Sequence, residues 1–205
     1  RSTLFPYTTL FRSSRMDEIT GLAAVLRNKA NTISPKVADY VDFVGTGADC
    51  TYSFNISTTS AFVVAAAGLP VAKHGNRAIS SKSGAGDVLE ALGVNISADP
   101  AVVEKCVETV GIGFMFAPHF NPAMKYVGTV RKQLGIRTVF NILGPLSNPS
   151  RASAMLVGVY SPALTEEIAG TMMNLGVERG MVVSGEDNMD EITLTGETPV
   201  SEIKD

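Results

Sequence analysis

Residues 71–87 read Val-Ala-Lys-His-Gly-Asn-Arg-Ala-Ile-Ser-Ser-Lys-Ser-Gly-Ala-Gly-Asp, a run of basic, hydroxyl and amide side chains among glycines. We expect a short apolar strand at 69–72 before this run and a helix at 87–92 after it. Glycines let the backbone approach a ligand closely, and basic side chains favour negative charge. The run therefore predicts an anion-binding loop between a strand and a helix.

A similar unit lies upstream. A strand expected at 41–44 leads into Gly45-Thr46-Gly47-Ala48-Asp49, and Asn55-Ile56-Ser57-Thr58 opens an alanine-rich helix expected at 58–67. Either Asn55 or Ser57 could cap this helix and also face a phosphate. A single glycine-rich turn is a weak signal, whereas two such units in one chain predict a specific phosphate site.

Strands and helices continue to alternate further along the chain. We expect helices at 100–110, 122–134 and 165–175, and strands at 113–116, 154–160 and 181–184. This alternation is typical of an α/β fold with a mostly parallel sheet and flanking helices.

The N-terminal part is different in character. Residues 1–14 have no helical or strand pattern, resemble vector-derived sequence and are left out of the fold. Helices expected at 17–29 and, after Pro35, at 35–40 would form the remnant of a small helical subdomain, residues 15–40. Residues 41–205 would form the α/β domain.

Composition limits the function classes. The chain has 205 residues, 45% hydrophobic and 18% charged, which excludes disordered and fibrous proteins. There is no apolar run of the roughly 20 residues that span a bilayer and no signal-peptide pattern, so we expect a cytoplasmic protein without a membrane partner. Cys50 and Cys106 are expected to be reduced thiols.

The charge distribution points to a small anionic ligand. Net charge is −3, which does not indicate nucleic-acid binding. Residues 50–86 and 109–165 contain no acids but several lysines and arginines, whereas the chain from Glu166 onward is acidic. A divalent cation would be favoured in that acidic part.

Two further groups of residues could carry chemistry. Asp190-Glu191 follows the strand expected at 181–184, and carboxylates in that position can hold Mg²⁺ together with substrate phosphates; an ordinary surface pair is the alternative. Arg131, Lys132 and Arg137 could bind a carboxylate or be solvated surface groups.

Gly144 to Pro149 reads as a double turn that needs no ligand. His74 could be a structural hydrogen-bonder, but we interpret it as a binding residue.

These motifs together resemble those of the anthranilate phosphoribosyltransferase family, from Asp17 to about Thr195. The resemblance rests on Gly45–Asp49, Ser53–Thr58, Lys73–Ser81, Pro122–Lys125 and Phe140–Leu146. It implies a nucleoside phosphorylase/phosphoribosyltransferase-like fold. It also implies transfer of a phosphoribosyl group from phosphoribosyl diphosphate to anthranilate in tryptophan biosynthesis, with Mg²⁺ as cofactor and no covalent catalytic residue. A homodimer of the full-length protein is expected, with anthranilate synthase components as possible further partners.

The resemblance also assigns roles to residues. The diphosphate substrate would be bound by Gly45, Ala48, Asp49, Ser53, Asn55, Ile56, Ser57, Thr58, Lys73, His74, Gly75, Asn76, Arg77, Ala78, Ile79, Ser80, Ser81 and Ala85. Anthranilate would be bound by Gly45, Asn76 and Arg131. The metal would be held by Ser57, Asp190 and Glu191.

This sequence departs from the family pattern in places. Ala48 replaces a usual glycine, Ala85 a common serine, and Asn121 and Ser184 usual histidines. Family members also extend further at both ends, so we expect an incomplete sheet and marginal stability. The alternatives are a pyrimidine-nucleoside-phosphorylase-like enzyme and a non-catalytic relative that binds nucleic acid.

Overall fold

The structure is a computed structural model that describes residues 16–47, 51, 53–78, 82–134 and 138–204. Residues 129, 131, 132 and 134 are described by their backbone alone.

The described residues form a sheet of strands in the order β3-β2-β1-β4-β5-β6. The strands are β1 (Val41–Gly45), β2 (Val71–Gly75), β3 (Ile112–Phe116), β4 (Ala154–Gly158), β5 (Arg179–Val183) and β6 (Val200–Ile203). The first five are parallel, and β6 pairs antiparallel with β5 at the edge. The expected mostly parallel α/β sheet is confirmed.

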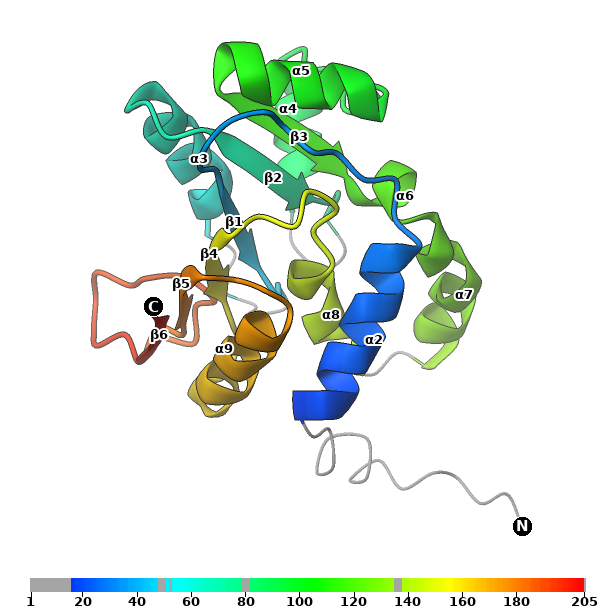
Figure 1. The fold of residues 1–205 in the computed structure, drawn as a ribbon. Helices are drawn as coiled ribbons and strands as arrows, with labels where there is room; N and C mark the ends of the chain where they lie inside the picture. The colour runs from blue at the N-terminus through cyan, green and yellow to red at the C-terminus, as the bar shows by residue number, and fades with distance from the viewer. Residues whose placement is uncertain (1–15, 48–50, 52, 79–81, 135–137, 205) are drawn as a thin grey trace.

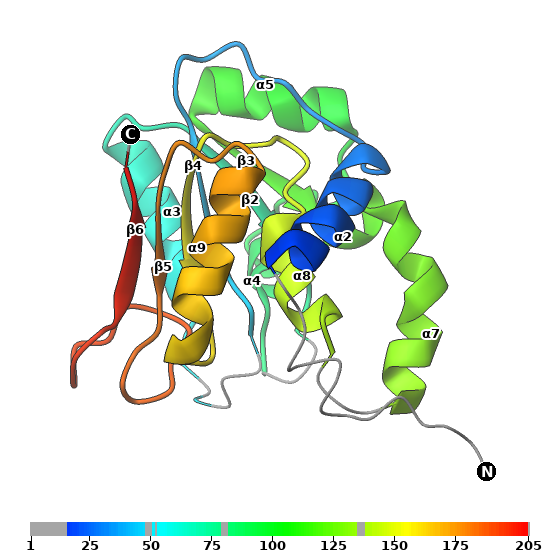
Figure 2. The ribbon, with the colours of Figure 1, turned by 60° about the horizontal axis from the view of Figure 1, so that its bottom comes forward.

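Helices cover both faces of the sheet (Figures 1 and 2). Alternate side chains of a strand point to opposite faces. Val41, Val71 and Ile112 therefore share one apolar cluster with α3 (Ile56–Ala66), and α4 (Ala85–Ala91) packs beside it against Phe114.

The opposite face is covered by more helices. The largest core cluster joins Met155, Val157 and Val182 of the sheet to α2 (Met16–Asn28), α8 (Phe140–Leu146) and α9 (Thr165–Asn174). Ala72 and Met115 pack against α5 (Pro100–Val110) and α6 (Ala117–Phe120). The remaining helices are η1 (Pro122–Met124), α7 (Lys125–Leu134) and η2 (Pro162–Leu164).

The helix expected at 35–40 was wrong. Residues 30–40 are irregular before β1, with bends at Ala30 and at residues 36–38. The backbone N–H groups of Ser34 and Lys36 donate to the carboxylates of Glu104 and Glu108 on α5, at 2.6 and 2.9 Å. These tertiary hydrogen bonds hold the segment along α5, where Figure 1 shows it. The helix expected at 17–29 is confirmed as α2.

The turn expected at Gly144 was also wrong in part. Helix α8 continues through Pro145 to Leu146. Leu143 and Leu146 are completely buried in the main core, so packing outweighs the tendency of Pro145 to break the helix.

Strand β6 and helix α6 were not predicted from the sequence. In the described part of the chain, no helix is long and apolar enough to cross a membrane.

Candidate functional site

Most of the predicted binding residues that the structure describes lie in or next to loops at the ends of parallel strands. The Gly45 loop follows β1, the Gly75 loop follows β2, and Asp190 and Glu191 lie in the long loop after β5. Ligands of open parallel sheets bind beyond these carboxyl ends, and β1 is the central strand at which the connections change direction.

The Gly45 loop is closed by Asp190. The backbone N–H of Gly47 donates to Asp190 Oδ2 at 2.6 Å, and Gly47 has a positive φ of 66° that favours glycine. A side chain at Gly45 would overlap the Asp190 carboxylate, and one at Gly158 would overlap the Asp190 backbone. Both glycines are therefore needed for Asp190 to lie against the ends of β1 and β4.

Ser57 and Glu191 meet at the start of α3. Ser57 Oγ donates to Glu191 Oε1 at 2.5 Å, and the Ser57 backbone N–H approaches the same oxygen at 3.2 Å. The expected side-chain cap is not formed by Asn55, which occupies the N-cap position of α3 but donates from Nδ2 to the Ser83 carbonyl at 3.3 Å. Asn55 thus links the two predicted phosphate loops.

The three predicted metal residues offer oxygen atoms only. Asp190 contacts the Gly45 loop through Gly47, and Glu191 contacts the start of α3 through Ser57. Among the described residues, no group of three or more His, Cys, Asp and Glu side chains forms a metal cluster. Mg²⁺ is commonly held by one or two carboxylates together with substrate phosphates, so this donor set fits Mg²⁺.

Lys73 is buried beside two acids. Its ammonium donates to the Phe43 carbonyl, and its side chain is 4% exposed. Burial lowers the pKa of Lys73, while Asp42 and Glu191 oppose that shift electrostatically. Burial raises the pKa of Asp42 to about 6, and Lys73, Asn148 and the His74 N–H counteract the rise. Lys73 thus brings positive charge close to the metal residues.

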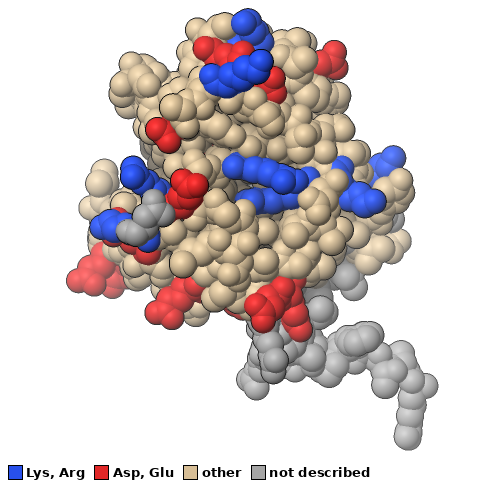
Figure 3. Space-filling model, in the orientation of Figure 1, with Lys and Arg blue, Asp and Glu red and all other residues tan. Residues whose placement is uncertain are grey.

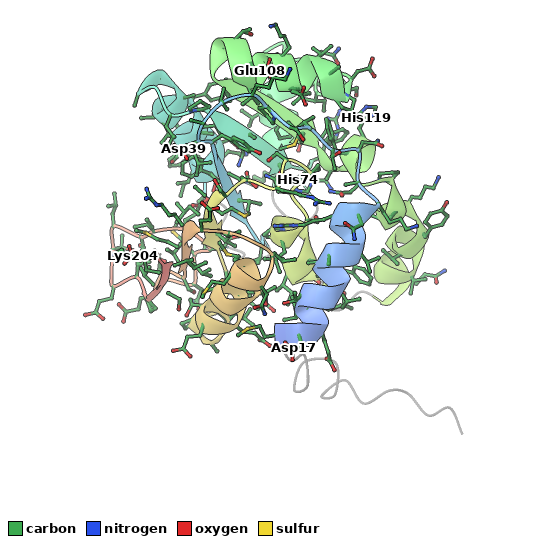
Figure 4. The ribbon with its side chains drawn as sticks, viewed as in Figure 1. Asp17, Asp39, His74, Glu108, His119 and Lys204 are labelled. Carbon is green, nitrogen blue, oxygen red and sulfur yellow. The ribbon has the colours of Figure 1, made fainter. Side chains whose placement is uncertain are left out.

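His74 lies in the interior of the molecule, as Figure 4 shows. Asn121 Nδ2 is 2.9 Å from His74 Nε2, and the Gly144 backbone opposes the lowering of the ring's pKa. Burial, and then the charge of Lys73, lower the pKa of His74 to about 4. The imidazole is therefore neutral at pH 7.

Arg77 forms ion pairs with two acids of α4. Its guanidinium bonds Glu90 at 2.7 and 2.8 Å and Asp87 at 3.2 Å. Asp87 also accepts the backbone N–H groups of Ala78 and Gly84, both at 2.8 Å, and these bonds lower its pKa. The loop after β2 is thus tied to the start of α4, where Ala85 lies.

The other predicted residues vary in placement. Ser53, Asn76 and Gly75 lie around the two loops, and Ile56 and Thr58 lie in the first turn of α3. The backbone of Arg131 lies in α7. Ala48, Asp49, Ile79, Ser80 and Ser81 lie outside the described residues.

Sequence reasoning missed two polar residues next to the site. Asp42 and Asn148 are both 0% exposed, and Asn148 Nδ2 donates to Asp42 Oδ2 at 2.6 Å. Asp42 is the one acid in the apolar strand expected at 41–44. A buried charge needs hydrogen-bonding partners, so its presence there could have indicated a buried polar contact.

A family model described as the a/b domain of a glycosyl transferase family matches residues 37–205. The chain belongs to this glycosyl transferase family. The match begins just before β1 and contains all the described loops of the candidate site.

Similar proteins narrow the resemblance within the glycosyl transferase family. An anthranilate phosphoribosyltransferase of Acetivibrio thermocellus is 58% identical over 94% of this chain, and one of Alkaliphilus metalliredigens is 53% identical over 94%. This agrees with the resemblance read from the motifs. The chain spans 56% and 57% of the lengths of these two relatives.

Solved structures give the same result. The anthranilate phosphoribosyltransferase of Thermus thermophilus superimposes with a TM-score of 0.90 at 47% identity, over 94% of this chain and 58% of that one. The enzyme of Saccharomyces cerevisiae in complex with phosphoribosyl diphosphate and Mg gives a TM-score of 0.86 at 33% identity, over 92% and 53%.

Proposed function

We propose that this chain is the donor-binding part of an anthranilate phosphoribosyltransferase of tryptophan biosynthesis. The observation that carries the proposal is the meeting of the Gly45 loop, Ser57, Asp190 and Glu191 at the ends of β1 and β5. The yeast relative that was solved with phosphoribosyl diphosphate and Mg supports the same ligands.

The proposed reaction joins the two substrates directly. The anthranilate nitrogen forms a bond to the anomeric carbon of the ribose as the bond from that carbon to the diphosphate oxygen breaks. The diphosphate leaves with the bonding electrons, and the nitrogen loses a proton to water. The product is N-(5-phosphoribosyl)anthranilate. Holding both reactants in place and stabilising the leaving charge can supply the rate enhancement without a covalent intermediate.

The chain's residues would divide these tasks. Backbone N–H groups of the Gly45 and Gly75 loops would donate to the phosphates, and buried Lys73 would add positive charge. Asp190, Glu191 and Ser57 would hold Mg²⁺. When bound, the ion would neutralise negative charge on the diphosphate oxygens. His74 would remain neutral and act through hydrogen bonds.

The acceptor side is proposed from the resemblance. Gly45, Asn76 and Arg131 would contact anthranilate, with the Arg131 guanidinium on its carboxylate. We also propose that the whole protein is a homodimer, works in the cytoplasm and meets anthranilate synthase components. The free thiol of Cys106 is compatible with a reducing compartment.

The alternative functions have less support. A phosphorylase of similar architecture would bind inorganic phosphate. That reaction would not need the paired carboxylates of Asp190 and Glu191. A nucleic-acid-binding relative would need a continuous basic surface. On the face drawn in Figure 3, basic side chains form a short band with acidic side chains above and below it.

The metal assignment can be tested by removing both carboxylate charges. We expect Asp190→Asn with Glu191→Gln to abolish the effect of Mg²⁺ on phosphoribosyl diphosphate binding while the circular dichroism spectrum is unchanged, because amides bind Mg²⁺ poorly. Glu186→Gln, an exposed change in the same loop, is the matched control and should keep the effect. An undiminished magnesium effect in the double variant would show that the two carboxylates are not the ligands.

A further inference from the structure

Asn148 has a side chain whose polar atoms are all used inside the protein. Nδ2 donates to Asp42 Oδ2 at 2.6 Å and to the Ala72 carbonyl at 3.0 Å. Oδ1 accepts the backbone N–H and the hydroxyl of Ser150, both at 2.7 Å. A primary amide has two N–H donors and two lone pairs, so Asn148 is fully satisfied and its orientation is fixed.

These bonds join parts of the chain that are far apart in sequence. Asp42 belongs to β1, Ala72 to β2, and Asn148 to the loop after α8. Asp42 Oδ1 in turn accepts the backbone N–H of His74 at 3.1 Å. The amide and the carboxylate therefore link β1 to β2 through Asp42 and Ala72, the second residue of each strand, and through His74, which lies one residue before the end of β2.

The two strands lead into the two predicted phosphate loops. The Gly45 loop begins three residues after Asp42, and the Gly75 loop begins directly after His74. A small shift of β1 along β2 would move one loop relative to the other. A bound diphosphate could then not receive hydrogen bonds from both loops at once.

Several charges surround the Asp42 carboxylate. Lys73 of β2 and Arg27 of α2 both interact with it electrostatically, and Asp42 itself is 0% exposed. A donor at position 148 is needed because a buried carboxylate without hydrogen bonds is costly. The Asn148 amide supplies that donor without adding charge.

We propose that Asn148 is a positioning residue of the diphosphate site: through Asp42 it holds β1 and β2 in the alignment that lets both phosphate loops bind one diphosphate. This proposal rests on the proposed function. Because Asn148 and Asp42 are both completely buried, their effect on the substrate would be indirect.

The test exchanges amide and carboxylate. Asn148→Asp places two carboxylates face to face, which raises the pKa of the pair. At pH 8 we expect phosphoribosyl diphosphate affinity, measured by calorimetry with Mg²⁺, to fall about tenfold or more. Affinity should recover toward pH 5.5, because one shared proton restores a hydrogen bond.

The double variant Asp42→Asn with Asn148→Asp restores one amide and one carboxylate. The amide then introduced at position 42 can still accept from the His74 N–H and donate to position 148. We therefore expect most of the affinity to return, with the pH dependence of the unmodified chain. Asn95→Asp is the matched control, because Asn95 is exposed and its Oδ1 only accepts the Ser97 N–H. It should bind like the unmodified chain.

A second readout needs no ligand. We expect hydrogen exchange of the amides at 43–47 and 74–78 to speed up in Asn148→Asp and to slow again in the double variant. A folded Asn148→Asp variant with unmodified affinity at pH 8 would overturn the proposal. If the unmodified chain itself does not bind the diphosphate, the proposed function fails, and unchanged exchange in Asn148→Asp would then overturn the positioning role independently.

Discussion

At the scale of single residues, the site depends on small side chains as much as on charged ones. Gly45 and Gly158 leave room for Asp190, whose carboxylate accepts the Gly47 N–H at 2.6 Å. The sequence analysis predicted Gly45 and Asp190 as binding residues from motifs. It could not predict Gly158, because the need for that glycine comes from the close approach of the Asp190 backbone, in the loop after β5.

A substitution at Gly158 tests this packing. Gly158→Ala would place a methyl group on the Asp190 backbone, and we expect a loss of about 1–3 kcal/mol in the free energy of unfolding measured in urea. Gly21→Ala on α2 is the control, because nothing lies within 4 Å of that added methyl group. The control should be neutral or gain up to about 1 kcal/mol. Equal stabilities of both variants would contradict the account.

At the scale of elements, local patterns predicted the strands β1 to β5 and the helices α2, α3, α5 and α9. The patterns failed where distant contacts decide the structure. Residues 35–40 do not form a helix because carboxylates of α5 accept the backbone N–H groups of Ser34 and Lys36. Helix α8 runs through Pro145 because its leucines are buried in the main core. Strand β6 has four residues, of which two are apolar, so the alternation of apolar and polar residues was too short to predict a strand.

Burial of His74 on β2 should make stability depend on pH. Its pKa is about 4 in the folded chain and about 6.5 when unfolded, so the unfolded state takes up a proton first as pH falls. The stabilisation by neutral His74 is complete above pH 6.5 and should decrease by roughly 3 kcal/mol between pH 6.5 and pH 4.

The variant His74→Gln isolates this effect, because glutamine is uncharged and can form similar hydrogen bonds. We expect the difference in unfolding free energy between the unmodified chain and His74→Gln to shrink over that pH range. Asp42 contributes with the opposite sign, since its raised pKa favours the folded state at low pH, but it is present in both proteins and cancels. A difference that stays constant from pH 7 to pH 4 would mean that His74 is not held neutral.

At the scale of the whole molecule, the loops of the candidate site lie together at the carboxyl ends of the parallel strands. The face of β4, β5 and β6 beside α3 forms an open groove of about 580 Å³ with Leu156, Met181 and Ile192 along it. The fold and the place of the site were predictable because strand and helix patterns alternate and glycine loops follow strands. The buried partners Asp42 and Asn148 were not, since their pairing joins residues that only the folded chain brings together.

The central claim is that these loops bind phosphoribosyl diphosphate with Mg²⁺. A calorimetric titration of the unmodified chain tests it most directly, with inorganic phosphate titrated in parallel. We expect saturable binding of one phosphoribosyl diphosphate per chain, at least about tenfold tighter with Mg²⁺ than without it, and much weaker binding of phosphate. Binding of phosphate alone, or diphosphate binding that ignores Mg²⁺, would contradict the account.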